Sequence, residues 1–342
     1  MSEITRKVYR ILPGSMKSLK ISEETISPPQ AGEVRIRVKA IGLNFADVFS
    51  VWKLYSAIPK GAFIPGLEYA GEVESIGTGV EDLSVGDRVM GISRFGAYAS
   101  HLNIDARYVI KLPSSWSYAE GASYLVQALT AYYALIELGG LKAGMNVLVH
   151  SAAGGVGTYA NRIAKKLGAY TIGTVGNAQK VDYCKQEGYD EVMVRDNASF
   201  GEQLDKQLGD RPLNLILECI GGPVLKAGYK KLAEQGRMVV YGSAYYASDR
   251  DKPRFLDLFL KYRKRPMIDP QQMIQYNKGI LGFNLIYLYE QVELMHQLLG
   301  DLEQMELASP TVGETFNFEQ LPDALRLFRT GKTIGKVVVT ID

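Results

Sequence analysis

The sequence is poor in the residues that form disulfide frameworks and metal sites. Its 342 residues include two cysteines, Cys184 and Cys219, and three histidines. Two cysteines cannot form a disulfide framework or a four-thiolate zinc site. The histidines, at positions 101, 150 and 296, lie far apart, which favours packed or solvated side chains over ligands of one metal ion. We therefore expect a cytoplasmic protein, in a reducing compartment, without a bound metal.

The sequence also lacks an excess of charge and a long apolar run. Lysine and arginine total 39 and aspartate and glutamate total 37, so the formal net charge is +2. This balance does not indicate a nucleic-acid partner. Residues 1–20 do not resemble a signal peptide, and no apolar run approaches the ~18 residues of a membrane-spanning helix. With 46% hydrophobic residues, the chain is long enough for two globular domains.

A strand–turn–helix–strand pattern in residues 146–175 organises the rest of the chain. An apolar run at 146–150 leads into a turn that reads Ala-x-Gly-x-x-Gly, and an amphipathic helix follows as far as Gly168. The residues predicted to bind a dinucleotide here are Ala152, Ala153, Gly154, Gly155, Val156 and Gly157. Small residues allow a pyrophosphate to reach the free N–H groups at the helix N-terminus. The alternative is a tight turn without a ligand.

The alternation of strands and helices continues after this turn. Strands are predicted at 147–150, 170–175, 191–194, 213–220, 237–241 and 280–285, and helices at 179–187, 200–208 and 224–233. Six strands are the number in a full dinucleotide-binding sheet. The sequence therefore predicts an α/β fold with a doubly wound, parallel Rossmann sheet.

The residues before this sheet have a different pattern. Apolar and basic residues alternate at 34–40, and short strands at 69–76 and 88–92 lie among many glycines and prolines. This pattern predicts an irregular antiparallel β-barrel. Ser117 and Glu120 form a predicted capping box that opens a helix running through residues 125–138. At the other end of the chain, a helix is predicted near 321–329, and the strand 336–340 is expected to return to the first domain.

The residues after the second Rossmann strand indicate which nicotinamide cofactor is bound. An NAD-specific fold has an acidic residue about 20 positions after the glycines, where it binds the ribose 2′-hydroxyl. Here the corresponding segment contains Gly176 and no Asp or Glu, and Lys180 and Arg195 follow it. Because a 2′-phosphate favours such donors, we predict NADPH. The alternative is that both cations are ordinary solvated side chains.

Several motifs together resemble the medium-chain dehydrogenase/reductase superfamily, in its zinc-free quinone oxidoreductase group. They are Gly-x-Asn-x-x-Asp at 42–47 and the segments 65–71, 85–89, 129–132 and 152–157. Residues 282–285 and the long insert before them are similar to the vesicle amine transport protein-like branch. The resemblance implies a GroES-like domain at 1–124 completed by 287–342, a Rossmann domain at 125–286, and usually a homodimer.

The sequence departs from the zinc-dependent relatives of this family. Asn44 and Leu67 stand where those relatives have the zinc ligands Cys and His, and Glu68 is the only residue of that zinc site that remains. Without zinc, hydrogen-bond donors must stabilise the oxyanion that forms as hydride arrives. The resemblance places Asn44 and Tyr55 in the substrate cleft, and we predict both as catalytic residues. The alternatives are a turn-stabilising amide for Asn44 and a wall residue for Tyr55.

Other residues are expected near the cofactor because of their places at helix and strand ends. They are Gln127, Thr130, Ile220, Gly242, Phe283 and Asn284. The predicted function is NADPH-dependent, zinc-independent reduction of quinones or related α,β-unsaturated carbonyls. Aromatic residues at 49, 52 and 55 suit a flat apolar substrate or simply fill the core.

A second function class stays open. Residues 255–265 are apolar and then basic, as in a segment that lies on anionic lipid, so the chain is alternatively an interaction or membrane-surface protein that keeps the cofactor fold. Packing of this segment on the Rossmann sheet or on a dimer partner is the simpler interpretation. A homodimer is expected through the exposed edge of the last Rossmann strand.

Overall fold

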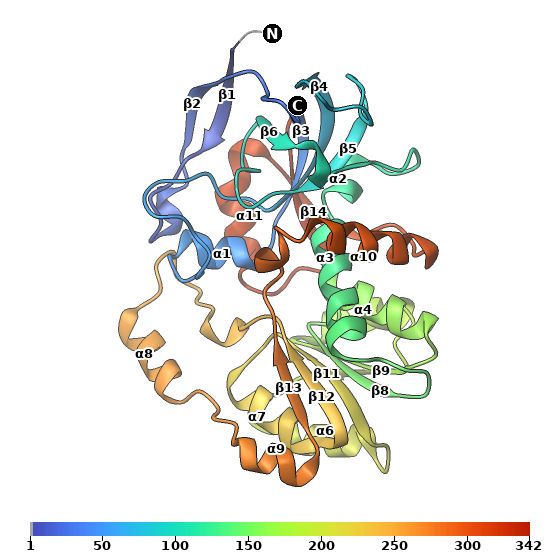
Figure 1. The fold of residues 1–342 in the computed structure, drawn as a ribbon. Coiled ribbons are helices and arrows are strands. Elements are labelled where there is room, and N and C mark those ends of the chain that lie inside the picture. Colours follow the sequence, from blue (N-terminus) through green and yellow to red (C-terminus); the bar gives the residue numbers. More distant parts are fainter. Residues whose placement is uncertain (1–2) are drawn as a thin grey trace.

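The structure, a computed structural model, describes residues 3–342, and a six-stranded parallel sheet forms the lower half of the molecule (Figure 1). Its strands are β8 (Asn146–His150), β9 (Tyr170–Val175), β10 (Glu191–Val194), β11 (Leu213–Glu218), β12 (Leu232–Val240) and β13 (Gly279–Gly282). Their order is β10-β9-β8-β11-β12-β13, so the direction of winding reverses between β8 and β11. The predicted doubly wound Rossmann sheet is confirmed, and ligands bind such sheets at this switch point.

Helices cover both faces of this sheet. They include α3 (Leu125–Tyr132), α4 (Gly155–Lys166), α5 (Val181–Gln186), α6 (Phe200–Leu208) and α7 (Gly222–Lys231). All residues of β8 are buried. A parallel strand that is covered on both faces has a continuous apolar sequence, and this pattern predicted β8.

The second large sheet forms the upper half of the molecule (Figure 1). Its strands are β3 (Glu33–Gly42), β4 (Glu68–Ile76), β5 (Arg88–Ile92), β6 (His101–Asp105), β7 (Val109–Lys111), β14 (Val312–Asn317) and β15 (Lys336–Thr340). The pairs are antiparallel as predicted, except that β14 and β15 are parallel. This exception arises because α11 (Leu321–Phe328) connects them as a crossover helix. The strand β15 pairs with β3, which is the predicted return to the first domain.

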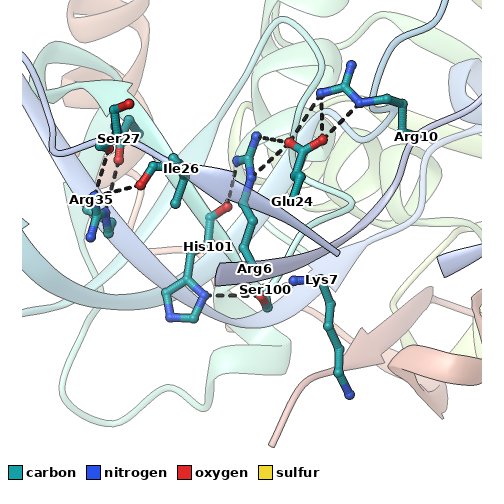
Figure 2. A network of polar contacts seen from close by, with 10 residues as sticks. Arg6, Lys7, Arg10, Glu24, Ile26, Ser27, Arg35, Ser100 and His101 are labelled. Carbon is teal, nitrogen blue, oxygen red and sulfur yellow. Dashed lines mark hydrogen bonds and ion pairs between the residues drawn. The ribbon is translucent and has the colours of Figure 1, made fainter. Parts of the chain in front are cut away.

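A hairpin of β1 (Ile4–Tyr9) and β2 (Ile21–Ile26) is attached to this sheet through arginines (Figure 2). Arg6 pairs with Glu24 at 2.7 Å and donates to the main-chain oxygen of His101 at 2.8 Å. Arg35 donates to the main-chain oxygen of Ser27 at 2.7 Å. Arg35 is buried for this reason, although the alternation in β3 predicts an exposed side chain at its position.

The helix predicted over 117–138 is interrupted. The capping box of Ser117 and Glu120 is present, but α2 (Tyr118–Gly121) ends after one turn and α3 begins anew, continuing as a π-helix at 133–138. The break allows the N–H group of Val126, in the first turn of α3, to donate to Oε1 of Glu68 at 3.0 Å. A continuous helix would satisfy this N–H group internally.

Two other predictions near the end of the Rossmann sheet are wrong in detail. The strand β13 ends at Gly282, so Phe283 and Asn284 follow it, and a 3-10 turn begins at Leu285. Segment 255–265 forms α8 (Phe255–Arg263), which contains no buried residue and therefore does not pack on the sheet. The other part of that interpretation, packing on a dimer partner, stays a prediction. The remaining helices are α1 (Phe45–Val51), α9 (Pro270–Tyr276) and α10 (Val292–Gln304).

Residues 3–342 contain no helix with the length and apolar content needed to cross a bilayer.

The edge strand β13 generates a prediction about oligomeric state. Among the described residues β13 pairs with β12 alone, so its outer edge offers unpaired backbone groups to a second copy. We expect a homodimer at low micromolar concentration. Leu281→Pro removes a backbone donor and should give monomer or aggregate, whereas Leu281→Ala keeps the donor and the dimer. Light scattering measures both, and a monomeric wild type would contradict the prediction.

Candidate functional site

A cavity of about 1340 Å³ is lined by residues of both large sheets and their loops. The predicted site residues that line it are Asn44, Tyr55, Gln127, Thr130, Ala153, Gly154, Gly155, Val156, Gly157, Gly176, Lys180, Arg195, Ile220, Gly242, Phe283 and Asn284. Ala152 is the exception, since it is fully buried and does not line the cavity. Its N–H group donates to the main-chain oxygen of Thr174 at 3.0 Å, so Ala152 packs the turn against β9 and offers nothing to a ligand.

Two glycines leave room for a ligand, Gly154 in the glycine-rich turn and Gly176 directly after β9. Gly154 is the N-cap of α4, and no side chain caps this helix. A Cβ atom at Gly154 would meet only Ser151 O, at 3.3 Å, and one at Gly176 would meet nothing within 4 Å. By contrast, a Cβ atom at Gly157 would lie 2.5 Å from Ser151 O. Gly154 and Gly176 therefore face the cavity, whereas Gly157 allows the helix to pack closely on its strand.

A loop near the C-terminus closes over this turn. The N–H group of Gly335 donates to Ala153 O at 2.8 Å, and Nζ of Lys180 donates to Gly331 O at 2.6 Å. Burial lowers the pKa of Lys180 from its usual value. Lys332, on the same loop, also lines the cavity. The sequence analysis missed this loop, because its contact with the turn joins residues that are far apart along the chain.

The charges around the cavity are all of one sign. The cationic side chains that line it are Lys180, Arg195, Arg329, Lys332 and Lys336. No Asp or Glu among the described residues lines it. The cavity therefore favours an anionic ligand.

Tyr55 and Asn284 meet across the cavity. The hydroxyl group of Tyr55 donates to Oδ1 of Asn284 at 2.7 Å. Burial raises the pKa of Tyr55 to about 12, so the phenol keeps its proton at neutral pH. Tyr55 is therefore a hydrogen-bond donor. A substrate oxygen can share this donor with Asn284 or take the place of Asn284.

Asn44 is held by other protein groups. Its Oδ1 atom accepts from Nε2 of Gln127 at 2.7 Å and from Nζ of Lys336 at 2.9 Å, and its Nδ2 atom donates to Gly42 O at 3.2 Å. The amide is thus already engaged, which favours the turn-stabilising role over the predicted donor to substrate. Asn44 still forms part of the cavity wall.

Lys336 forms an ion pair that the sequence analysis did not predict. Its Nζ atom lies 2.7 Å from Oε2 of Glu68, and the two side chains are 3% and 0% exposed. Burial lowers the pKa of Lys336, and the charge of Glu68 opposes this shift. The signal in the sequence was a lysine at the start of an apolar strand. A lysine in this place usually marks a strand end that is exposed to solvent.

A second buried pair supports the turn after β11. Oε1 of Glu218 accepts the N–H groups of Ile220 and Gly221, and its Oε2 atom lies 3.4 Å from Nε2 of His150. Burial raises the pKa of Glu218 and lowers that of His150. These bonds end β11 at Glu218, although the apolar pattern continues to Ile220, and they turn Ile220 into the cavity.

Comparison with known proteins identifies the family. The alcohol dehydrogenase GroES-like domain family matches residues 30–114, and the zinc-binding dehydrogenase family matches 155–291. The synaptic vesicle membrane protein VAT-1 homolog of Rattus norvegicus is 30% identical over 331 residues, covering 95% of this chain and 81% of the relative. The chain belongs to the medium-chain dehydrogenase/reductase superfamily, in its quinone oxidoreductase-like group.

Other members of this superfamily have the same fold. The VAT-1 homolog of Danio rerio is 31% identical over 316 residues, and the match covers 92% of this chain but 65% of the relative. The solved structure of mycobacterial Rv1454c complexed with NADPH is 28% identical, has a TM-score of 0.83, and is matched over 98% of this chain and 99% of that chain. The predicted combination of a GroES-like domain and a Rossmann domain is confirmed.

The ion pair of Lys336 and Glu68 at the cavity wall makes a prediction about stability. Lys336→Met leaves the carboxylate of Glu68 buried without its counter-charge, and breaking a buried pair in this way costs about 3–5 kcal/mol. We expect the free energy of unfolding, measured in urea, to fall by this amount. Adding Glu68→Gln should recover most of the loss.

Lys332→Met is the matched control, because Lys332 lines the same cavity but is exposed. Its free energy of unfolding should stay within about 0.5 kcal/mol of wild type. Equal stability of the Lys336→Met and Lys332→Met variants would show that the ion pair has no structural role.

Proposed function

We propose that the protein is an NADPH-dependent, zinc-independent reductase of quinones or related α,β-unsaturated carbonyls. The observation that carries this proposal is the charge of the cavity. Lys336 and Arg329 are paired with Glu68 and Asp251, but Lys180, Arg195 and Lys332 have no acidic partner among the described residues and line the cavity together with an uncapped helix N-terminus. A phosphate-rich dinucleotide matches this arrangement. The NADPH complex of the superfamily member Rv1454c supports the choice of cofactor.

The residues of this chain that would hold the cofactor follow from the geometry. The N–H group of Gly154 donates to Ser151 O, so the N–H groups of residues 155–157 would bind the pyrophosphate. Lys180 and Arg195, which line the cavity near Gly176, would bind the 2′-phosphate. Other contacts would come from residues that line the rest of the cavity, namely Gln127, Thr130, Ala153, Ile220, Gly242, Phe283 and Asn284.

Bound NADPH would supply a hydride, which carries two electrons, and the substrate takes up one further proton to complete the reduction. Tyr55 is placed to donate a hydrogen bond or that proton to the carbonyl oxygen, with solvent restoring its own. Apolar neighbours such as Phe49 and Leu54 line the same cavity and suit a flat ring. The engaged amide of Asn44 would then position Gln127 and would not touch the oxyanion.

The domain boundaries at 124 and 286 and the cytoplasmic location belong to the same proposal. The two cysteines are both free thiols, which suits a reducing compartment. The pairing of β14 with β15 and of β15 with β3 supports the assignment of the C-terminal strands to the GroES-like domain.

The second candidate function is an interaction or membrane-surface role. It is favoured by the exposed apolar side chains of α8 and by the basic residues that follow them. The VAT-1 relatives, which are named synaptic vesicle membrane proteins, also favour it. Co-sedimentation with anionic liposomes, measured beside NADPH oxidation, separates the two functions. Binding to liposomes without turnover of any quinone or enone would favour this second role.

Gly154→Val tests the cofactor site. A Cβ atom at Gly154 would meet only Ser151 O, at a tight 3.3 Å, so a small local shift should let the fold persist. The branched carbons would occupy the space of the pyrophosphate. We expect loss of NADPH binding in calorimetry, with an unchanged melting temperature. A folded Gly154→Val protein that binds NADPH normally would refute the site.

Lys180→Ala tests the preference for NADPH. Removing one charge-assisted hydrogen bond costs about 1.5–3 kcal/mol, or about one to two powers of ten in affinity. We expect this loss for NADPH and a much smaller one for NADH, because NADH lacks the 2′-phosphate. Arg195→Ala should behave in the same way. Equal losses for both cofactors would show that neither side chain binds the 2′-phosphate.

Tyr55→Phe tests the reaction. A general acid contributes about a hundredfold or more to a rate, so kcat with an enone should fall by at least this factor. With a quinone, whose reduced oxygen is weakly basic, the fall should be small. Tyr246→Phe is the matched control, since Tyr246 also lines the cavity.

Turnover of both substrates should be insensitive to a chelator if zinc has no role. Loss of activity on chelation, with recovery on adding zinc, would overturn zinc independence.

Equal effects of Tyr55→Phe and Tyr246→Phe on kcat would show that Tyr55 has no part in the chemistry.

A further inference from the structure

One face of α8 belongs to the cavity. Phe255, Leu258, Phe259 and Tyr262 all line it. Their spacing of i, i+3, i+4 and i+7 places the four side chains on a single face of the helix. Leu256 and Leu260 do not line the cavity.

This face is apolar and largely uncovered. Phe255 is 82% exposed, Phe259 47% and Tyr262 54%, and the rings of Phe255 and Phe259 stack with centroids 6.4 Å apart. Figure 1 shows α8 at the left edge of the molecule, outside the helices that cover the sheet. A contiguous exposed apolar surface on a protein usually marks a binding site.

The segment before α8 is fixed to the other domain. The main-chain oxygen of Asp251 accepts from Nε1 of Trp52 at 3.0 Å and from the N–H group of Met16 at 2.9 Å. Its carboxylate pairs with Arg326 at 3.1 Å and with Arg329 at 3.4 Å. These contacts fix the start of α8 relative to the GroES-like domain.

The helix itself is held from the Rossmann side. Nζ of Lys261 donates to Ala247 O at 3.2 Å and lies 5.4 Å from the ring centroid of Tyr245. Contacts with the GroES-like domain before the helix and with the Rossmann domain along it therefore hold the apolar face of α8 at the cavity.

We propose that this face of α8 binds an apolar chain carried by the substrate, so that the preferred substrates are quinones or enones with an alkyl or isoprenoid tail. The proposal rests on the proposed function, because the reactive head would occupy the cavity beside Tyr55. From residue 255 to residue 262 the face extends about 10 Å along the helix axis. The four side chains line the same cavity as Tyr55, and this continuity favours a substrate tail over a second protein copy or a lipid surface.

A series of para-benzoquinones with a methyl, butyl or octyl chain tests the proposal. In the wild type, KM should fall as the chain lengthens, by up to about fourfold for each methylene that is buried. The Phe255→Ser/Phe259→Ser variant should lose most of this dependence and keep its kcat/KM for the methyl compound. Both positions are exposed, so the variant should fold.

The Leu256→Ser/Leu260→Ser variant is the matched control, with equally exposed apolar side chains of the same helix that lie off the cavity. It should retain the full chain-length dependence. An equal loss in both variants, or a wild type that reduces the methyl compound but shows no chain-length effect, would overturn the proposal.

Calorimetry with the oxidised cofactor NADP⁺ separates this proposal from the proposed function, because no hydride is then available. Tighter binding of the octyl than the methyl quinone, abolished by Phe255→Ser/Phe259→Ser, would support the tail site even if no quinone is reduced. If that variant instead only dissolves a dimer or only weakens liposome binding, with chain-length dependence unchanged, the face has another occupant and the proposal is wrong.

Discussion

The buried ion pair between Lys336 and Glu68 is the contact on which the cavity depends. A buried pair is stable only when further hydrogen bonds satisfy its remaining atoms. Here Oε1 of Glu68 accepts the N–H group of Val126, and Nζ of Lys336 also donates to Asn44. One carboxylate thus connects β4, β15, the turn before α1 and the start of α3. Because α3 leads into the Rossmann domain, this cluster fixes the two walls of the cavity relative to each other.

The parts of the fold that the sequence predicted are those with local causes. The turn after β8, the helix α4 and the strand β9 lie within one stretch, and their periodicity and small residues specify them without help from distant residues. The break between α2 and α3 could not be predicted in this way. Its cause is the bond from Val126 to Glu68, which joins residues 58 positions apart. The same holds for Arg35, whose buried side chain also donates to Oδ1 of Asn103, 68 positions away.

The predictions about the site divide in the same way, between local motifs and long-range contacts. Motif residues such as Gly154 and Tyr55 were predicted to line a common cleft, and the cavity contains both. What the motifs could not show is the set of bonds that each side chain makes. Asn44 was predicted as a donor to the substrate, with a turn-stabilising amide as the alternative, and the motif gave no sign of its contacts with Gln127 and with Lys336, which is 292 positions away. The role of a polar residue in a buried cluster depends on partners that only tertiary packing brings together.

The cavity combines two kinds of surface, and their separation limits what it can bind. Lys180 and Lys332 lie on the glycine-turn side, at the loop that docks on Ala153, whereas Lys336 is paired with Glu68. The apolar surface of the cavity extends to α8. A molecule that fills both must carry anionic groups at one end and apolar surface at the other, or two molecules must share the space. Since unpaired charges lose their hydration when buried, a charged chain on α8 would be disfavoured. A phosphate-rich cofactor beside an apolar acceptor satisfies both surfaces, which is why the charge distribution and the position of α8 support the same reaction.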